Sequence, residues 1–461
     1  MDLNKIKSIY FIGIGGIGMS AIARMLLLDP PSQSFGEERR IMGSDRAKSV
    51  VTEELEKLGV KIFYQQVAKN ISADIDLVIY TIAISEDNPE LKKARELGIE
   101  CRTYPEMLGL ISADKYTIAV AGTHGKTTTT AMIAKVLIEA KLDPMVIVGS
   151  LLLPEGNPRE ISLGLPSGKA TNFIAGQSDY FVVEACEYRR SFLNLNPKIG
   201  IITNIDSDHL DYYKDLADIQ LAFSEFASRI PTDGFLICDI SDPLLSPVIN
   251  RTKAQIIDYC SLGGFTSKLE LLVPGEHNIK NAQCALAVAQ ILNVEQNTAI
   301  EALKKFTGTW RRFEYKGQTK NDALVYDDYA HHPTEIRATI GGAREFMAKR
   351  NLMGKLIIAF QPHLYSRTKA LMTDFAEALS LVDKVMVAKI YAARELFDPE
   401  VKEEKLVELI NAKAGKNIAS FFGDFVSIEQ DLENESKVGD LVVVMGAGDI
   451  NQVANSLVMK N

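Results

Sequence analysis

Short, almost uninterrupted runs of apolar residues, each followed by a turn and a helix-compatible segment, recur along most of this chain. The clearest runs are Ser8–Ile14, Asp76–Thr81, Tyr116–Ala121, Tyr180–Ala185, Ile199–Asn204, Leu324–Asp328, Leu356–Gln361, Lys384–Lys389 and Leu441–Gly446. A strand that is apolar at consecutive positions is typical of a parallel sheet covered by helices on both faces. Because each run alternates with a helical segment, the pattern predicts an α/β fold built from βαβ units.

The length of the chain and two breaks in this pattern predict three domains. The 461 residues exceed the ~100–200 residues of one typical domain. A new strand starts at Tyr116, and a polar stretch over residues 316–322 interrupts the pattern after Arg312. We therefore expect domains over residues 1–107, 108–312 and 313–461.

Net charge and cysteine content indicate which binding partners are disfavoured and which cellular compartment is expected. The chain has 51 Lys and Arg against 60 Asp and Glu, a net charge of −9, which argues against a nucleic-acid or anionic-membrane partner. Its five Cys form no CxxC pair, and we expect reduced, mostly buried thiols in a cytoplasmic protein. The longest uncharged stretch, Ser8–Ala23, contains four glycines and is shorter than the ~20 apolar residues that span a bilayer.

A first glycine-rich turn lies between a predicted strand and the predicted helix over Met19–Leu28. It matches GxGxxG, and its glycines are Gly13, Gly15, Gly16 and Gly18. Such glycines let backbone N–H groups approach a diphosphate at the N-terminus of a helix. Asp45 ends the next strand, where a carboxylate can accept hydrogen bonds from a ribose or base. The motif alone leaves three interpretations open: an NAD site, a site for another such ligand (a UDP-sugar, for example), or a structural turn.

A second glycine-rich loop follows the strand Tyr116–Ala121 and precedes a helix. It reads Gly122-Thr123-His124-Gly125-Lys126-Thr127-Thr128. Lys126 can reach nucleotide phosphate oxygens, and the Thr127 hydroxyl can bind Mg²⁺. The strict GxxxxGK[ST] pattern fails because Val120 replaces its first glycine, but the remaining glycines still form an anion-binding nest. The loop predicts nucleotide binding rather than a chance match, and we expect its flexible lysine to bury little surface.

Two further polar residues follow strands of the same predicted sheet. Glu184 ends one strand, and His209 follows the next. Ligands of open parallel sheets bind beyond the carboxyl ends of the strands, where the glycine-rich loop also lies. A carboxylate and an imidazole there can complete a metal shell begun by Thr127. The structural alternatives are a cap or ion pair for Glu184 and a hydrogen-bonded core histidine for His209.

The remaining candidate residues open helices. Asn278 and Asn281 are three positions apart and share one helix face, where they can contact adenine or cap the helix. In the last domain, the segments that contain His331 and Arg367 each follow a strand and start a helix. The planar guanidinium of Arg367 suits bidentate binding of a carboxylate, and the alternative is a surface charge.

Together these motifs resemble those of the Mur ligases, in the same order along essentially the whole chain. The segments that carry the resemblance are 122–128, Glu184, Asp-His-Leu-Asp-Tyr-Tyr (208–213), His-Asn-x-x-Asn (277–281), Trp-Arg-Arg-Phe-Glu (310–314), Asp-Asp-Tyr-Ala-His-His-Pro-Thr-Glu (327–335) and Gln-Pro-His-x-Tyr-Ser-Arg-Thr (361–368). The resemblance implies a Rossmann-like UDP-sugar domain, a central P-loop ATPase domain and a C-terminal Rossmann-like domain that brings the amino acid.

The reaction implied by the resemblance joins L-alanine to the carboxylate of UDP-N-acetylmuramate in peptidoglycan synthesis, with ATP and Mg²⁺ as cofactors. ATP converts the carboxylate, a poor electrophile, into an acyl phosphate that the amine attacks. A cytoplasmic monomer or weak homodimer is expected. Three alternatives remain: a ligase that recycles murein tripeptide, an NAD-linked oxidoreductase and a non-catalytic nucleotide sensor.

The resemblance also implies a role for each candidate residue. Catalytic roles fall to Lys126, Glu184, His209, His331 and Arg367, and Mg²⁺ would be bound by Thr127, Glu184 and His209. ATP would be held by Gly122, Thr123, His124, Gly125, Lys126, Thr127, Thr128, Asn278, Asn281, Arg312 and Asp328, and the UDP part by Gly13, Gly15, Gly16, Gly18 and Asp45. Two positions depart from the family pattern: Cys186 replaces an acidic residue, and Leu364 replaces an Arg that would contact a carboxylate.

Overall fold

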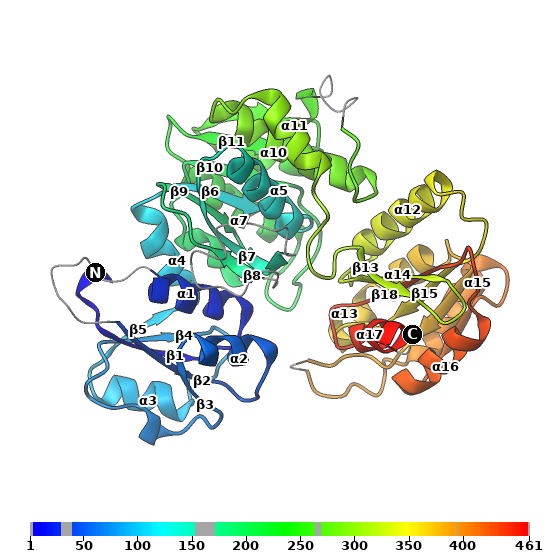
Figure 1. The fold of residues 1–461 in the computed structure, drawn as a ribbon, viewed down its shortest axis with the longest axis horizontal. Coiled ribbons are helices and arrows are strands. Elements are labelled where there is room, and N and C mark those ends of the chain that lie inside the picture. Colours follow the sequence, from blue (N-terminus) through cyan, green and yellow to red (C-terminus); the bar gives the residue numbers. More distant parts are fainter. Residues whose placement is uncertain (1–2, 29–38, 153–170, 263–268, 394, 460–461) are drawn as a thin grey trace. The chain divides into compact units, whose positions relative to one another are not determined.

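The computed structural model describes residues 3–28, 39–152, 171–262, 269–393 and 395–459, and it contains three open sheets (Figure 1). Contacts divide the chain into two compact units. The first comprises residues 1–206, 216–267 and 282–303, and the second comprises 207–215, 268–281 and 304–461. The α/β class expected from the sequence is confirmed, whereas the domain boundaries at 107 and 312 stay predictions.

The first sheet of the first unit is fully parallel, with strand order β3-β2-β1-β4-β5. Its strands are β1 (Ser8–Ile12), β2 (Arg40–Ser44), β3 (Lys61–Phe63), β4 (Leu77–Tyr80) and β5 (Glu100–Thr103). Its helices are α1 (Ile17–Leu28), α2 (Val50–Lys57), α3 (Pro89–Glu96) and α4 (Tyr104–Ala113). Every residue of β1 is buried, as a strand covered on both faces requires.

The second sheet also belongs to the first unit and has the order β12-β11-β10-β6-β9-β7-β8, with β8 antiparallel to β7. Its strands are β6 (Tyr116–Ala121), β7 (Met145–Leu152), β8 (Thr171–Ile174), β9 (Tyr180–Glu184), β10 (Ile199–Ile202), β11 (Phe235–Cys238) and β12 (Gln255–Asp258). Its helices are α5 (Lys126–Glu139), α7 (Leu216–Ser228), α8 (Ser246–Ile249), α11 (Gln296–Lys304) and α10 (Glu276–Ile291), whose first residues belong to the second unit. Since β6 lies at the centre, the loop after it has strand ends on both sides.

The third sheet forms the second unit, with strand order β13-β14-β18-β15-β16-β17 and only β13 antiparallel to its neighbour. Its strands are β13 (Glu314–Gln318), β14 (Leu324–Asp328), β15 (Leu356–Phe360), β16 (Lys384–Val387), β17 (Ala419–Phe421) and β18 (Leu441–Met445). Its helices are α12 (Pro333–Lys349), α13 (Tyr365–Ala370), α14 (Met372–Leu379), α15 (Glu403–Ala414), α16 (Phe425–Glu435) and α17 (Asn451–Met459). One apolar cluster joins the sheet to α12, α14 and α15, and another joins its other face to α16 and α17.

Short 3-10 helices complete the described structure: η1 (Leu3–Lys5), η2 (Ala68–Asn70), η3 (Tyr188–Asn194), η4 (Pro243–Leu245) and η5 (Tyr259–Leu262). Within residues 3–28, 39–152, 171–262, 269–393 and 395–459, no helix is long and apolar enough to cross a membrane. The expectation that most cysteines are buried is wrong, because only Cys238 and Cys284 are buried and Cys186 is exposed.

Candidate active site

The glycine turn of the first sheet has the predicted strand–turn–helix context between β1 and α1. Gly13 has a φ of +84°, a backbone conformation that favours glycine. A Cβ atom on Gly18 would overlap the Tyr104 ring, so this glycine permits close packing. The backbone N–H of Gly15 donates to Asp45 Oδ2 at 2.8 Å. Asp45 therefore closes the turn, and its contact with a ribose or base stays a prediction.

The second glycine-rich loop joins β6 to α5 and depends on two glycines. Gly122 has a φ of +133° and Gly125, the N-cap of α5, a φ of +81°. A Cβ atom on Gly122 would overlap the Thr203 hydroxyl, which belongs to the segment after β10. The loop is thus folded tightly over a neighbouring strand end, with its N–H groups at the N-terminus of a helix, an arrangement suited to anions.

Lys126 is held inside this loop by an ion pair that the sequence pattern did not reveal. Its ammonium donates to the carbonyl oxygens of Gly122 at 2.6 Å and Thr123 at 2.9 Å, and it lies 2.9 Å from Glu187 Oε2. The two side chains are only 14% and 3% exposed. Burial alone would lower the pKa of Lys126, but the Glu187 carboxylate raises it overall. The expectation that this lysine buries little is therefore wrong.

Thr127 and Glu184, two of the three proposed metal ligands, are brought together in the first unit. The Thr127 hydroxyl donates to Glu184 Oε2 at 3.0 Å, and the same oxygen accepts the N–H of Gly149 at 2.8 Å. A hydroxyl and a carboxylate beside a phosphate-binding loop are the hard oxygen donors that Mg²⁺ prefers. These residues therefore fit a magnesium ion.

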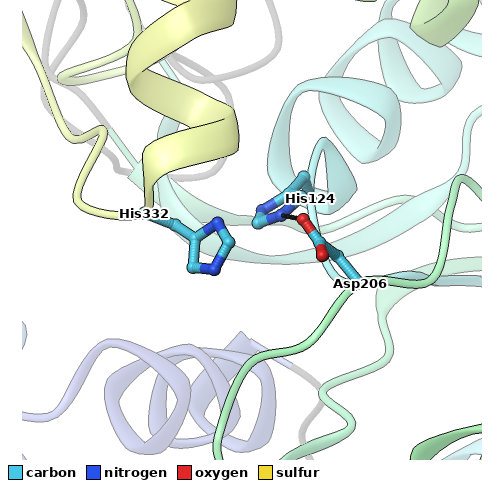
Figure 2. Close-up of side chains that lie close together, drawn as sticks. All are labelled: His124, Asp206 and His332. Atoms are coloured by element: carbon cyan, nitrogen blue, oxygen red, sulfur yellow. Dashed lines mark hydrogen bonds and ion pairs between the residues drawn. The ribbon is translucent and has the colours of Figure 1, made fainter. Parts of the chain in front are cut away.

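His124 anchors the loop to the segment that follows β10. Its ring Nε2 lies 3.0 Å from Asp206 Oδ2 (Figure 2), and its backbone N–H donates to Asn204 Oδ1 at 3.0 Å. His332, also drawn in Figure 2, belongs to the second unit. His124 is thus a positioning residue for the loop, and its predicted contact with ATP stays a prediction.

Arg367 lies in the first turn of α13, in the second unit, as the sequence predicts. Its Nη2 donates to Asp208 Oδ1 at 2.8 Å, and its Nη1 lies 3.1 Å from His363 Nδ1. The Arg367 and Asp208 side chains are 8% and 11% exposed, so Arg367 is no surface charge. Burial raises the pKa of Asp208, but the neighbouring His209, Arg367 and His331 side chains outweigh burial and hold that pKa well below its usual range.

A cavity of about 180 Å³ lies against this ion pair. It is smaller than the ~300–1,000 Å³ of typical drug-sized ligand pockets, so it suits a small ligand. Leu364, at a φ of +69°, is 3% exposed and forms part of the wall. The residues that line the cavity are Ser207, Asp208, His209, Leu210, Asp211, Leu364, Ser366, Arg367, Ala370 and Leu371.

His209 lines the same cavity in the second unit, with its Nε2 3.9 Å from Asp208 Oδ2. Its φ of +55° is an uncommon conformation for a residue other than glycine. Thr127 and Glu184 belong to the first unit, so a metal shell of all three residues stays a prediction.

His331 lies beside this group, with its Nδ1 3.0 Å from the Tyr329 carbonyl oxygen and 3.3 Å from Glu335 Oε2. Its ring centroid is 5.7 Å from that of His363. Burial lowers the pKa of His331 to about 4. The ring is therefore neutral at pH 7.

The neutral state of His331 predicts how stability depends on pH. An unfolded histidine binds a proton below pH ~6.5, whereas the folded ring does so only near its pKa of about 4. His331 therefore does not lower the free energy of unfolding above pH ~6.5, but it lowers that free energy progressively as the pH drops towards 4. We expect His331→Gln to reduce the loss of unfolding free energy over this range by about 3 kcal/mol. Thermal unfolding of both proteins at pH 7 and pH 4.5 measures the difference, and equal losses would contradict the prediction.

The two asparagines share one face of α10, as predicted. Asn278 donates through its side-chain nitrogen to the Pro274 carbonyl at 2.7 Å, and Asn281 donates to Asn278 Oδ1 at 3.2 Å. Both are buried. Their side chains form one connected pair, and contact with adenine stays a prediction.

Arg312 and Asp328 lie near each other at the end of β14, but they differ in how far their hydrogen-bonding groups are already used within the protein. The Asp328 oxygens accept the N–H groups of Phe313 at 2.8 Å and Ala330 at 2.7 Å. The Arg312 guanidinium lies over the Tyr329 ring at 5.1 Å and is partly exposed. Arg312 therefore retains donors for a phosphate, while Asp328 mainly shapes the loop. Contact of either residue with ATP stays a prediction.

Comparisons of the sequence with known protein families and curated proteins identify relatives of this chain. Three sequence models match the chain in order: "Mur ligase family, catalytic domain" at residues 8–116, "Mur ligase middle domain" at 120–264 and "Mur ligase, glutamate ligase domain" at 311–448. UDP-N-acetylmuramate–L-alanine ligase of Clostridium kluyveri is 43% identical over 98% of both chains. The ligase of that name from Caldanaerobacter subterraneus subsp. tengcongensis is 42% identical, over 100% of this chain and 99% of its own.

A solved structure shares the architecture as well. The UDP-N-acetylmuramate–alanine ligase of Thermotoga maritima aligns over 98% of both chains with a TM-score of 0.75 and 28% identity. The relatives match over nearly the full length, and the three family domains follow one another in the same order along the chain. This chain belongs to the Mur ligase family.

Proposed function

We propose that this protein joins L-alanine to the carboxylate of UDP-N-acetylmuramate, with ATP converted to ADP and phosphate. The observation that carries the proposal is the β6–α5 loop, which places Lys126 beside the Thr127–Glu184 pair at the carboxyl edge of a mostly parallel sheet. Relatives of that name match the chain over nearly its whole length. ATP-dependent activation is the chemistry that such a loop supports.

The chain's own residues supply binding and orientation at the phosphates. The loop N–H groups and the Lys126 ammonium bind phosphate oxygens and place the terminal phosphorus in line with the substrate carboxylate. Mg²⁺ bound by Thr127 and Glu184 would neutralise negative charge there. The carboxylate oxygen attacks the terminal phosphorus, ADP leaves, and the amine then displaces phosphate from the acyl phosphate.

The second unit supplies features suited to the amino acid. Arg367 presents a buried guanidinium at a cavity of about 180 Å³, which is suited to a carboxylate on a small molecule. Leu364 forms an apolar part of the cavity wall, where the family pattern has an arginine. We infer that Arg367 carries most of the carboxylate recognition. His331 lies near this group, and we expect it to contact the incoming amino acid.

The glycine turn between β1 and α1 is assigned to the UDP group. The full-length relatives favour the alanine-adding reaction over recycling of murein tripeptide and over NAD-linked oxidation. We expect the protein to act in the cytoplasm as a monomer or weak homodimer, without a nucleic-acid or membrane partner.

Phosphate release with UDP-N-acetylmuramate, ATP and Mg²⁺ tests the proposal across L-alanine, glycine, L-serine and the murein tripeptide. We expect release with L-alanine that stops when Mg²⁺ is removed. Release with the tripeptide alone would identify a recycling ligase, and NADH oxidation an oxidoreductase. Nucleotide binding without turnover on any acceptor would identify a sensor.

A further inference from the structure

Two consecutive arginines after β9 have an unusual backbone conformation. In η3, Arg189 has φ 51° and ψ 30°, and Arg190 has φ 55° and ψ 26°. Non-glycine residues adopt this left-handed conformation infrequently, and such strain clusters at ligand sites. The same segment supplies Glu184 and Glu187 to the β6–α5 loop. The strained pair therefore directly follows the phosphate-binding machinery.

The two arginines differ in their partners. Arg190 forms ion pairs with α7: its Nη2 lies 2.5 Å from Asp218 Oδ1, and its Nη1 lies 3.0 Å from Glu225 Oε2. Arg189 is exposed, donates to the Ile82 carbonyl oxygen at 3.2 Å and lies over the Tyr188 ring. No carboxylate among the described residues pairs with Arg189. Because a guanidinium has five N–H donors, Arg189 keeps most of them for another acceptor.

The contact with Ile82 places Arg189 at the carboxyl edge of the first sheet. Ile82 follows Thr81, whose N–H donates to the Ile12 carbonyl oxygen at 3.3 Å. A Cβ atom on Gly13 would lie 2.7 Å from Thr81 Cγ2, so this loop packs against the glycine turn. A cation that follows a strand of the second sheet therefore contacts the loop that packs against the anion-binding turn of the first.

We propose that Arg189 binds the diphosphate of the UDP-sugar, together with the glycine turn between β1 and α1. The inference rests on the proposed function, because that function brings a diphosphate to this turn. A guanidinium recognises phosphate oxygens bidentately, whereas the helix N-terminus offers N–H groups from the other side. With a left-handed backbone at both positions, the adjacent side chains have different partners: Arg190 contacts α7, and Arg189 contacts the Ile82 carbonyl oxygen beside the turn.

The test replaces each arginine with asparagine, which tolerates the left-handed conformation. We expect Arg189→Asn to raise the Kd of UDP and of UDP-N-acetylmuramate by at least about tenfold, the effect of losing one charge-assisted contact. Uridine, which lacks phosphate, should bind both forms equally. Arg189→Lys should restore part of the affinity. Arg190→Asn, the matched control, should lower Tm and leave the Kd of UDP unchanged. Isothermal titration gives each Kd.

Each other result has a defined meaning. If the unaltered protein binds neither UDP nor UDP-N-acetylmuramate, the proposed function itself fails. If it binds both and Arg189→Asn changes neither Kd, the inference is overturned. A loss confined to UDP-N-acetylmuramate would assign Arg189 to the substrate carboxylate, and a loss confined to ATP would assign it to the other nucleotide. An equal loss for uridine would show only a structural role. All three results overturn the diphosphate assignment.

Discussion

Lys126→Ala is expected to lower kcat by at least about 10²-fold, the usual effect of removing one preorganised charge that stabilises a transition state. The Lys126 ammonium is fixed by two loop carbonyls and Glu187, so it needs little reorganisation to contact a transferred phosphoryl group. Initial rates of phosphate release at saturating substrates measure the effect. Near-normal turnover would remove Lys126 from the mechanism.

The same substitution also has a structural cost, because it leaves the nearly buried Glu187 carboxylate without its lysine partner. Removing one member of a buried ion pair typically costs about 3–5 kcal/mol. The double variant Lys126→Ala/Glu187→Gln removes that unpaired charge and should recover Tm but not kcat. If turnover recovers together with Tm, Lys126 has only a structural role.

Arg367→Lys is expected to raise KM for L-alanine well above tenfold, equivalent to more than about 1.4 kcal/mol, and to leave KM for ATP nearly unchanged. A lysine cannot reproduce bidentate donation to a carboxylate while it also contacts Asp208. Since Leu364 gives the cavity no second guanidinium, the loss is concentrated in amino-acid binding. Steady-state kinetics with each substrate varied separately give the two KM values.

Arg337→Lys is the matched control for this experiment. Arg337 lies on α12, is 41% exposed and pairs with Glu377 in solvent, so neither KM should change. Equal losses for L-alanine and ATP in Arg367→Lys would contradict the assignment. The amino-acid site would then have to be sought around His331 and His332.

Local sequence predicted nine of the described strands, which are distributed over all three sheets, but it missed apolar strands such as β7 (Met145–Leu152). Each predicted strand is present, although several end one or two residues early, as β1 does at Ile12. The glycine turn begins there, because Gly13 leaves the extended conformation. Short edge strands such as β3 (Lys61–Phe63) and β17 (Ala419–Phe421) were not predicted. They contain polar residues and are partly solvent-exposed, so no continuous apolar run marks them.

The sequence by itself determined where the candidate chemistry lies. Glycine-rich loops, a lysine, a threonine and carboxylates follow buried strands, and the carboxyl ends of parallel strands meet at one edge whatever the rest of the chain does. Thr127 and Glu184 were therefore expected together and lie in contact. This inference needed only strand direction and residue type.

Only the tertiary structure decided which charges pair. Lys126 and Glu187 are 61 residues apart, and Arg367 and Asp208 are 159 residues apart. A local pattern shows that each group is charged, but it does not show which charges fold against each other. Glu187 could be suspected only from its place three residues after Glu184, and Asp208 only from its place in the His209 motif. Burial of such pairs determines which cations are fixed and which, like Arg189, keep donors for a ligand, because a charge removed from water needs a partner.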